Sequence, residues 1–161
     1  MYFSWVAYFA SRNSFGIYPD AYQQYEKNTL ENLSCLTIEM RAARASLNVE
    51  DGFEPFFAVL MPAIGSFLSA SADLLGCYDA MGVDINDTPV IAAFADAGLA
   101  NWLIYYRRDL DNLFATDAYW FAPEDFLRLN RHLERLLWQF ALFPFYEKDE
   151  LKIYILGLPQ A

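Results

Sequence analysis

The sequence predicts an all-α or nearly all-α fold, and three observations carry that prediction. Apolar residues recur at steps of three and four over several long segments. Residues that favour helix starts, such as aspartate or threonine followed by proline, precede those segments. The connections between them are short. We therefore expect one domain over residues 1–161, built as an up-and-down bundle of four long helices with short extra elements at the N- and C-terminal ends.

The first long helix is expected after Asp20, which stands in the position of a helix cap with Gln23 three residues later. An apolar stripe then runs from Tyr22 to Leu47. The segment before it, Tyr2 to Ala10, is short and aromatic, and its periodicity fits a helix or a strand equally well. Gly16 and Pro19 separate the two segments.

The second long helix is expected over Phe53 to Tyr78, after a cap at Asp51. Pro62 lies inside it and predicts a kink or a break, because proline removes one backbone hydrogen bond. Pro55 to Ala72 contains no charge, which meets the lower length limit for a membrane span. Its prolines and serines, and Asp73 directly after it, favour a buried bundle helix instead.

The third long helix follows the cap pair Thr88 and Pro89 and is expected to run from Val90 to about Phe114. The fourth begins at Pro123 and ends at Pro144. The tail from Leu151 to Leu156 alternates in the manner of a strand, and the N-terminal segment is one possible partner for it.

Charge is distributed unevenly along the chain, whose formal net charge is −10. Residues 45–106 contain no lysine, arginine or histidine. This balance argues against direct binding to nucleic acid, which needs cations to displace counterions, and it favours a basic protein partner. The base-free segment carries eight carboxylates: Glu50, Asp51, Glu54, Asp73, Asp79, Asp84, Asp87 and Asp96.

The catalytic inventory is poor, so we expect a protein that is not an enzyme, with no catalytic residues, no metal site and no cofactor. The single histidine, His132, is expected on a helix surface between arginines. Asp84 to Asp87 offers oxygen ligands but lacks the glycine and the closing glutamate of a calcium loop. Asp96, in an apolar helix, is expected to be buried with a polar partner.

The stripe of Arg128, Arg131 and Arg135 could hold an acidic ligand, although a solvated helix face explains it better. Cys35 and Cys77 are expected as buried free thiols, since two cysteines make no disulfide framework. The N-terminus lacks the basic residues of a secretory signal, and we expect a cytoplasmic protein.

On an up-and-down bundle the acidic residues are expected to gather at one end and form a partner-binding surface. Carboxylates there would pair with the cations of a partner, and exposed tyrosines would anchor the contact. The expected site comprises Asp73, Asp79, Asp84, Asp87, Tyr78, Tyr146, Glu147, Asp149 and Glu150.

The function expected from this surface is inhibition or neutralisation of a basic protein by occlusion, as in an immunity protein, an antitoxin or a nucleic-acid mimic. Two alternatives stay open. The high apolar content, 56% of residues, would also suit an oligomeric structural or assembly subunit. Eleven tyrosines and four tryptophans could line a small-molecule pocket in a helical binding domain.

Overall fold

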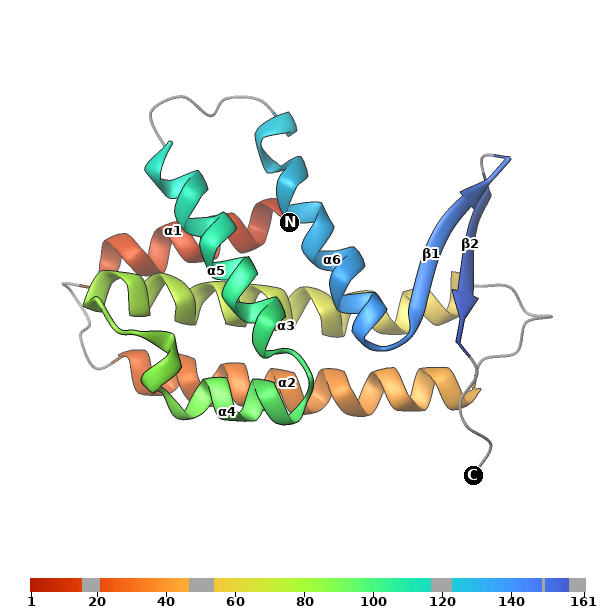
Figure 1. Cartoon of the computed structure of the whole chain (residues 1–161), viewed down its shortest axis with the longest axis horizontal. Helices are drawn as coiled ribbons and strands as arrows, with labels where there is room; N and C mark the ends of the chain where they lie inside the picture. Colours follow the sequence, from red (N-terminus) through yellow and green to blue (C-terminus); the bar gives the residue numbers. More distant parts are fainter. Residues whose placement is uncertain (16–20, 47–53, 117–122, 149, 157–161) are drawn as a thin grey trace.

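The computed structural model describes residues 1–15, 21–46, 54–116, 123–148 and 150–156, and it is mostly helical. Six α-helices and one β-hairpin make up the described part of the chain. The all-α character expected from the sequence is confirmed, while the number and arrangement of helices differ from four long antiparallel ones (Figure 1). Asp20, Leu47, Asp51 and Phe53 lie outside the described residues.

Three helices form the body of the molecule. Helix α1 spans Tyr2–Ser14, α2 spans Ala21–Ser46 and α3 spans Glu54–Met81. In Figure 1, α3 runs through the middle, with α1 on one side of it and α2 on the other. The stripe predicted for α2 is buried at Leu33, Leu36 and Met40.

Helix α1 crosses α3 very closely at Gly76. A Cβ atom built on Gly76 would lie 2.3 Å from the backbone oxygen of Tyr8 and 3.1 Å from the backbone nitrogen of Arg12. Only glycine allows this approach, so the crossing places Trp5 and Tyr8 directly in the core, where both are fully buried. The undecided N-terminal segment is therefore a core helix.

Helix α3 is continuous, and the break predicted at Pro62 is absent from it. Pro62 lies on the exposed side of the helix, while Leu60 and Ile64 next to it are buried. Burial of the opposite face offsets the single lost hydrogen bond. Residues 56–81 are long and apolar enough to cross a membrane, and half of their most apolar window is buried inside this fold.

The third predicted helix is two helices, which corrects the expectation of one helix over residues 90–114. Helix α4 spans Pro89–Asp96 and α5 spans Ala100–Ala115. Gly98 has φ of 75°, and the N–H of Leu99 donates to the oxygen of Phe94 across 2.6 Å. This is a Schellman C-cap, and it turns α5 out of the line of α4. A short 3-10 helix, η2 (Ile85–Asp87), connects α3 to α4.

The C-terminal part begins with the 3-10 helix η4 (Pro123–Phe126), followed by α6 over Leu127–Gln139. Helix α6 ends before Pro144, because Ala141 turns the chain with φ of 57°. Strand β1 (Leu142–Glu147) then pairs antiparallel with β2 (Glu150–Ile155). The C-terminal strand is confirmed, and its partner is this preceding segment rather than the N-terminus.

Candidate functional site

The acidic end predicted from the sequence does not assemble. The loop after α3, which carries Asp84 and Asp87, lies at one end of the molecule (Figure 1). The β-hairpin that carries Glu147 lies at the other end, beside the start of α3. Glu147 pairs there with Lys152 on β2, and this lysine lowers the pKa of the Glu147 carboxyl. Asp149 and the side chains of Tyr146 and Glu150 lie outside the described part of the structure.

Asp79 belongs to an internal ion-pair network rather than to a partner surface. Its carboxylate is only 9% exposed and lies 2.5 Å from Nη2 of Arg107 on α5. It also accepts a hydrogen bond from the hydroxyl of Tyr8 on α1, and Nη1 of Arg12 lies 3.9 Å away. Arg12 in turn pairs with Asp111 at 2.6 Å. Asp79 therefore joins α1, α3 and α5, and its charge is neutralised within the fold.

Asp73 and Tyr78 also form hydrogen bonds within the fold. The hydroxyl of Ser11 donates to Oδ1 of Asp73 across 2.7 Å, and burial raises the pKa of the Asp73 carboxyl above its ordinary value. Tyr78 was expected as an exposed anchor, yet its side chain is fully buried and donates to Glu26 on α2 across 2.6 Å. That expectation is wrong because Tyr78 faces α2 rather than the adjoining loop.

Asp84 and Asp87 are the exposed members of the predicted set in the loop after α3. The Asp84 carboxylate accepts hydrogen bonds from the backbone N–H and the side-chain amide of Asn86, at 3.0 and 2.9 Å. These bonds lower the pKa of Asp84. Asp84 thus caps η2, which is a local structural role.

His132 is buried against α5, which corrects the expected surface position. Its Nε2 lies 2.8 Å from Oδ2 of Asp109, and its ring contacts the rings of Trp102 and Tyr106. Burial lowers the pKa of His132, Asp109 opposes that shift, and nearby Arg135 and Arg131 add to it. The neutral imidazole therefore joins α5 to α6.

We expect the free energy of unfolding to decrease as pH falls below neutral, because of His132. Because its folded-state pKa is depressed, the unfolded chain binds the proton more readily as pH falls below about 6.5. The stability contribution is present above pH 6.5 and is lost as pH falls through the depressed pKa. Urea unfolding between pH 7.5 and pH 5 measures the slope, with His132→Gln as reference because the chain has no other histidine. Equal slopes for both proteins would contradict this assignment.

One arginine of the α6 stripe, Arg135, lies near Tyr105 on α5. The guanidinium carbon of Arg135 lies 5.7 Å from the Tyr105 ring centre, and that of Arg108 lies 5.0 Å from it. Arg128 and Arg131 are exposed. Helix α6 carries three arginines and one glutamate, whereas α5 carries two arginines and two aspartates, so the positive excess lies on α6.

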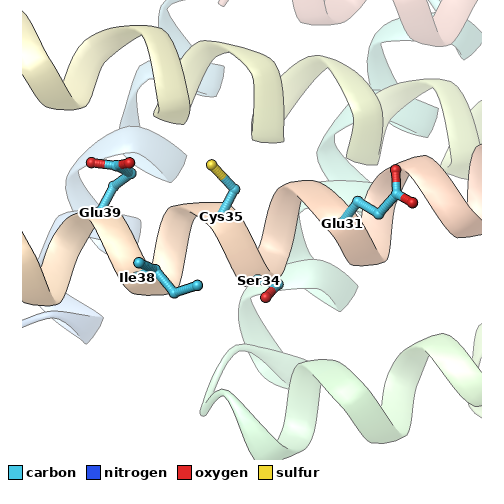
Figure 2. A pocket seen from close by; sticks show the side chains of 5 residues that line it. All are labelled: Glu31, Ser34, Cys35, Ile38 and Glu39. Carbon is cyan, nitrogen blue, oxygen red and sulfur yellow. The ribbon is translucent and has the colours of Figure 1, made fainter.

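Further carboxylates, which line two depressions of the surface, lie on α2 and α4, where the sequence did not place the site. Two adjoining depressions, of about 520 and 380 Å³, follow α2 and share Ser34 and Ile38. Figure 2 shows Glu31, Cys35 and Glu39 along one edge of α2, and Ser34 and Ile38 along the other. We call both depressions together the α2–α4 groove, lined by Leu30, Glu31, Leu33, Ser34, Cys35, Thr37, Ile38, Glu39, Arg41, Ala93, Asp96 and Ala97.

Ile38 is the prominent apolar side chain of this groove and is 61% exposed. The lining also includes three carboxylates, those of Glu31, Glu39 and Asp96, and the single guanidinium of Arg41. Nζ of Lys27 lies 3.9 Å from Oε1 of Glu31, and such an exposed ion pair contributes little to folding stability. The groove therefore combines an exposed apolar centre with a net negative rim.

Two expectations about individual residues are corrected at this groove. Asp96 is exposed rather than buried, because the Schellman turn after it ends α4 at the surface. As the last residue of α4, it lies where the helix dipole disfavours a negative charge. Cys35 is also exposed, whereas Cys77 is buried as expected. The signal for this surface in the sequence is Ile38, an isoleucine between Thr37 and Glu39.

Within the described residues, no group of three or more histidine, cysteine, aspartate or glutamate side chains is arranged to hold a metal ion. Asp109 and Asp111 lie two residues apart on α5 and face different partners, His132 and Arg12. Searches against protein-family profiles, curated proteins and solved structures found no match to this chain.

Proposed function

We propose that this chain is an acidic protein-binding domain that receives a basic segment of a partner protein in the α2–α4 groove. The observation that carries the proposal is the position of Ile38, an exposed isoleucine that lines the same depressions as Glu31, Glu39 and Asp96. An apolar contact surrounded by carboxylates is complementary to an amphipathic segment with lysine or arginine beside its apolar residues.

The charge of Asp96 supports binding rather than stability as the reason for this surface. A carboxylate at the C-terminal end of α4 costs about 0.3–1 kcal/mol at an exposed position. Neighbouring carboxylates Glu31 and Glu39 add to the negative potential over the same groove. Such a potential attracts cationic partners and accelerates association.

The shape of the groove favours a protein segment over a small ligand. Residues of α2 alone line the smaller depression, and residues of α2 and of the end of α4 line the larger one, so both are shallow and open to solvent. Small-molecule sites usually enclose most of the ligand. A helix or loop of a partner, by contrast, needs only one face covered. The mode of action proposed is occlusion: the domain covers a basic surface of its partner, as an inhibitor, antitoxin or immunity protein would.

The experiment compares two charge-reversed variants of equal charge. Glu39→Lys/Asp96→Lys changes the groove, while Asp84→Lys/Asp87→Lys makes the same change in the loop after α3. Wild-type protein captures its partner from lysate of the source cells at low salt, and stopped-flow mixing then measures association. We expect the groove variant to associate about tenfold or more slowly, with a flatter salt dependence, and the loop variant to stay near wild type.

A third variant, Ile38→Ser, is expected to leave association nearly unchanged and to accelerate dissociation, because it removes apolar contact and no charge. Lysine at residue 96 suits the helix dipole, so unfolding would not explain a binding defect. Equal effects of the groove and loop variants would contradict the proposed site. Capture that no charge reversal alters would contradict the proposed function.

A further inference from the structure

The β-hairpin offers a second interaction surface, at its backbone edge. The sheet has two strands, so β1 and β2 each have one edge without a strand partner in the described part of the chain. In Figure 1 the hairpin lies beyond α6, with β1 next to α6 and β2 on the far side. A free edge presents unpaired N–H and C=O groups that can bind another strand.

The register of β1 against β2 determines which residues have backbone groups that point outward, at the two edges of the hairpin. The N–H of Leu156 donates to the oxygen of Ala141 across 3.3 Å, so this pair is hydrogen bonded. Hydrogen-bonded and non-hydrogen-bonded pairs alternate in an antiparallel ladder. Pro144↔Ile153 and Leu142↔Ile155 are therefore non-hydrogen-bonded pairs, whose backbone groups point away from the hairpin.

The two edges differ in their capacity to bind a strand. On β1, Pro144 has an outward-facing backbone nitrogen with no hydrogen, which blocks continuous pairing at that edge. On β2, the outward-facing residues are Leu151, Ile153 and Ile155, and all three carry an N–H. β2 is also rich in β-branched and aromatic residues, which favour pairing. The edge of β2 is therefore the one that can pair with a further strand.

We infer that two copies of this chain associate through antiparallel pairing of their β2 strands, which forms one four-stranded sheet. A strand that pairs with its own copy must obey two-fold symmetry, which limits the register. With Ile153 opposite Ile153, all three outward-facing residues find partners, giving roughly six backbone hydrogen bonds.

The neighbouring symmetric registers are worse for reasons of charge and length. Shifting toward the turn places Lys152 directly opposite Lys152, and like charges opposite each other are destabilising. Shifting the other way leaves Leu151 without a described partner residue. In the register centred on Ile153, Lys152 lies opposite Tyr154 of the second copy, an arrangement in which a cation meets an aromatic ring.

The exposed aromatic face of the hairpin supports the inference that the partner is a second copy of this chain. Tyr154 is 59% exposed, Phe145 is exposed on the same face, and Trp138 stacks on Phe143 beside them. Pairing of two β2 strands brings the two aromatic faces together on one side of the sheet. It therefore shields apolar surface that a single copy leaves in water.

The first test compares two lysine substitutions at positions of similar exposure. Tyr154→Lys places a lysine opposite Lys152 of the second copy, whereas Val59→Lys, at a residue 57% exposed on α3, leaves the β2 edge unchanged. Light scattering coupled to size exclusion measures the molar mass across a concentration series. We expect dimers for wild type and Val59→Lys, and about a tenfold or greater rise in the dimer dissociation constant for Tyr154→Lys. A monomeric wild type, or a dimer indifferent to Tyr154→Lys, overturns the inference.

The second test measures the register in a Cys35→Ser background, because Cys35 is exposed. One copy carries Lys152→Cys and the other carries Tyr154→Cys. Residues opposite each other in a non-hydrogen-bonded pair have Cα atoms about 4.5 Å apart, which suits a disulfide. We expect oxidation to cross-link this mixture much faster than Lys152→Cys alone, and equal rates would overturn the proposed register.

Discussion

Replacing Gly76 by alanine is expected to lower the free energy of unfolding by about 1–3 kcal/mol, the usual cost of forcing an extra methyl group into a packed contact. The new Cβ would lie 2.3 Å from the backbone oxygen of Tyr8, so α1 has to move as a whole. The better helix propensity of alanine, worth roughly 1 kcal/mol, only partly offsets this. Urea denaturation monitored by circular dichroism measures the change.

The same helix contains a matched control. A Cβ at Gly65 would have no atom within 4 Å, so Gly65→Ala gains helix propensity without a clash. We expect Gly65→Ala to be neutral or to stabilise the protein by up to about 1 kcal/mol. If both alanines stabilised the protein equally, the close crossing of α1 and α3 would be wrong.

Replacing Asp79 by alanine is expected to cost about 2–4 kcal/mol of stability. Arg107, Arg12 and the hydroxyl of Tyr8 then lose the acceptor that joins them. Removing one partner of a buried ion pair typically costs about 3–5 kcal/mol. The two guanidiniums keep some contact with water, with side chains 21% and 23% exposed, which places the expected cost toward the lower part of that range. Chemical denaturation at neutral pH measures it.

Asp111→Ala provides the comparison for Asp79, because it also removes a carboxylate paired with Arg12. Asp111 is 53% exposed, and the loss is expected to stay below about 1 kcal/mol. A double-mutant cycle of Asp79→Ala with Tyr8→Phe should show coupling between the two side chains. Equal losses for Asp79→Ala and Asp111→Ala would show that Asp79 has no special structural role. Charge reversal at Asp79 is therefore unsuitable for binding experiments, because it would disrupt the packing of α1 against α3.

The sequence predicts the long helices well because their signals are local. The stripe of α2, the cap pair before α4 and the alternation of β2 each depend on neighbouring residues. The errors concern tertiary context. Pro62 is tolerated because α3 packs on its other face, and only the φ of Gly98 separates α4 from α5. The position of α1 depends on a close approach to Gly76, which no periodicity encodes.

The candidate site was harder to predict because it depends on which carboxylates are neutralised. Asp79 and Asp84 look alike in the sequence, yet Arg107, which follows Asp79 by 28 residues, forms an ion pair with Asp79 and acts on Asp84 only as a weaker charge interaction. Likewise, nothing local shows that Asp96 and Ile38 share one groove, since α4 meets α2 only in the folded chain. What the composition did predict is an excess of acidic surface. In the structure, exposed carboxylates lie in the loop after α3, at Asp84 and Asp87, and also on α2 and α4, at Glu31 and Asp96.

The contact between α1 and α3 also has a consequence during synthesis on the ribosome. Tyr8 and Asp79 are 71 residues apart, and Ser11 and Asp73 are 62 apart. At roughly 5–20 residues per second, α1 waits on the order of 4–14 s before its partner helix has been made. Throughout that interval Trp5 and Tyr8 have no core to enter. The N-terminal helix is thus the segment of the nascent chain that most needs protection from premature association, and a chaperone that binds aromatic segments would act there first.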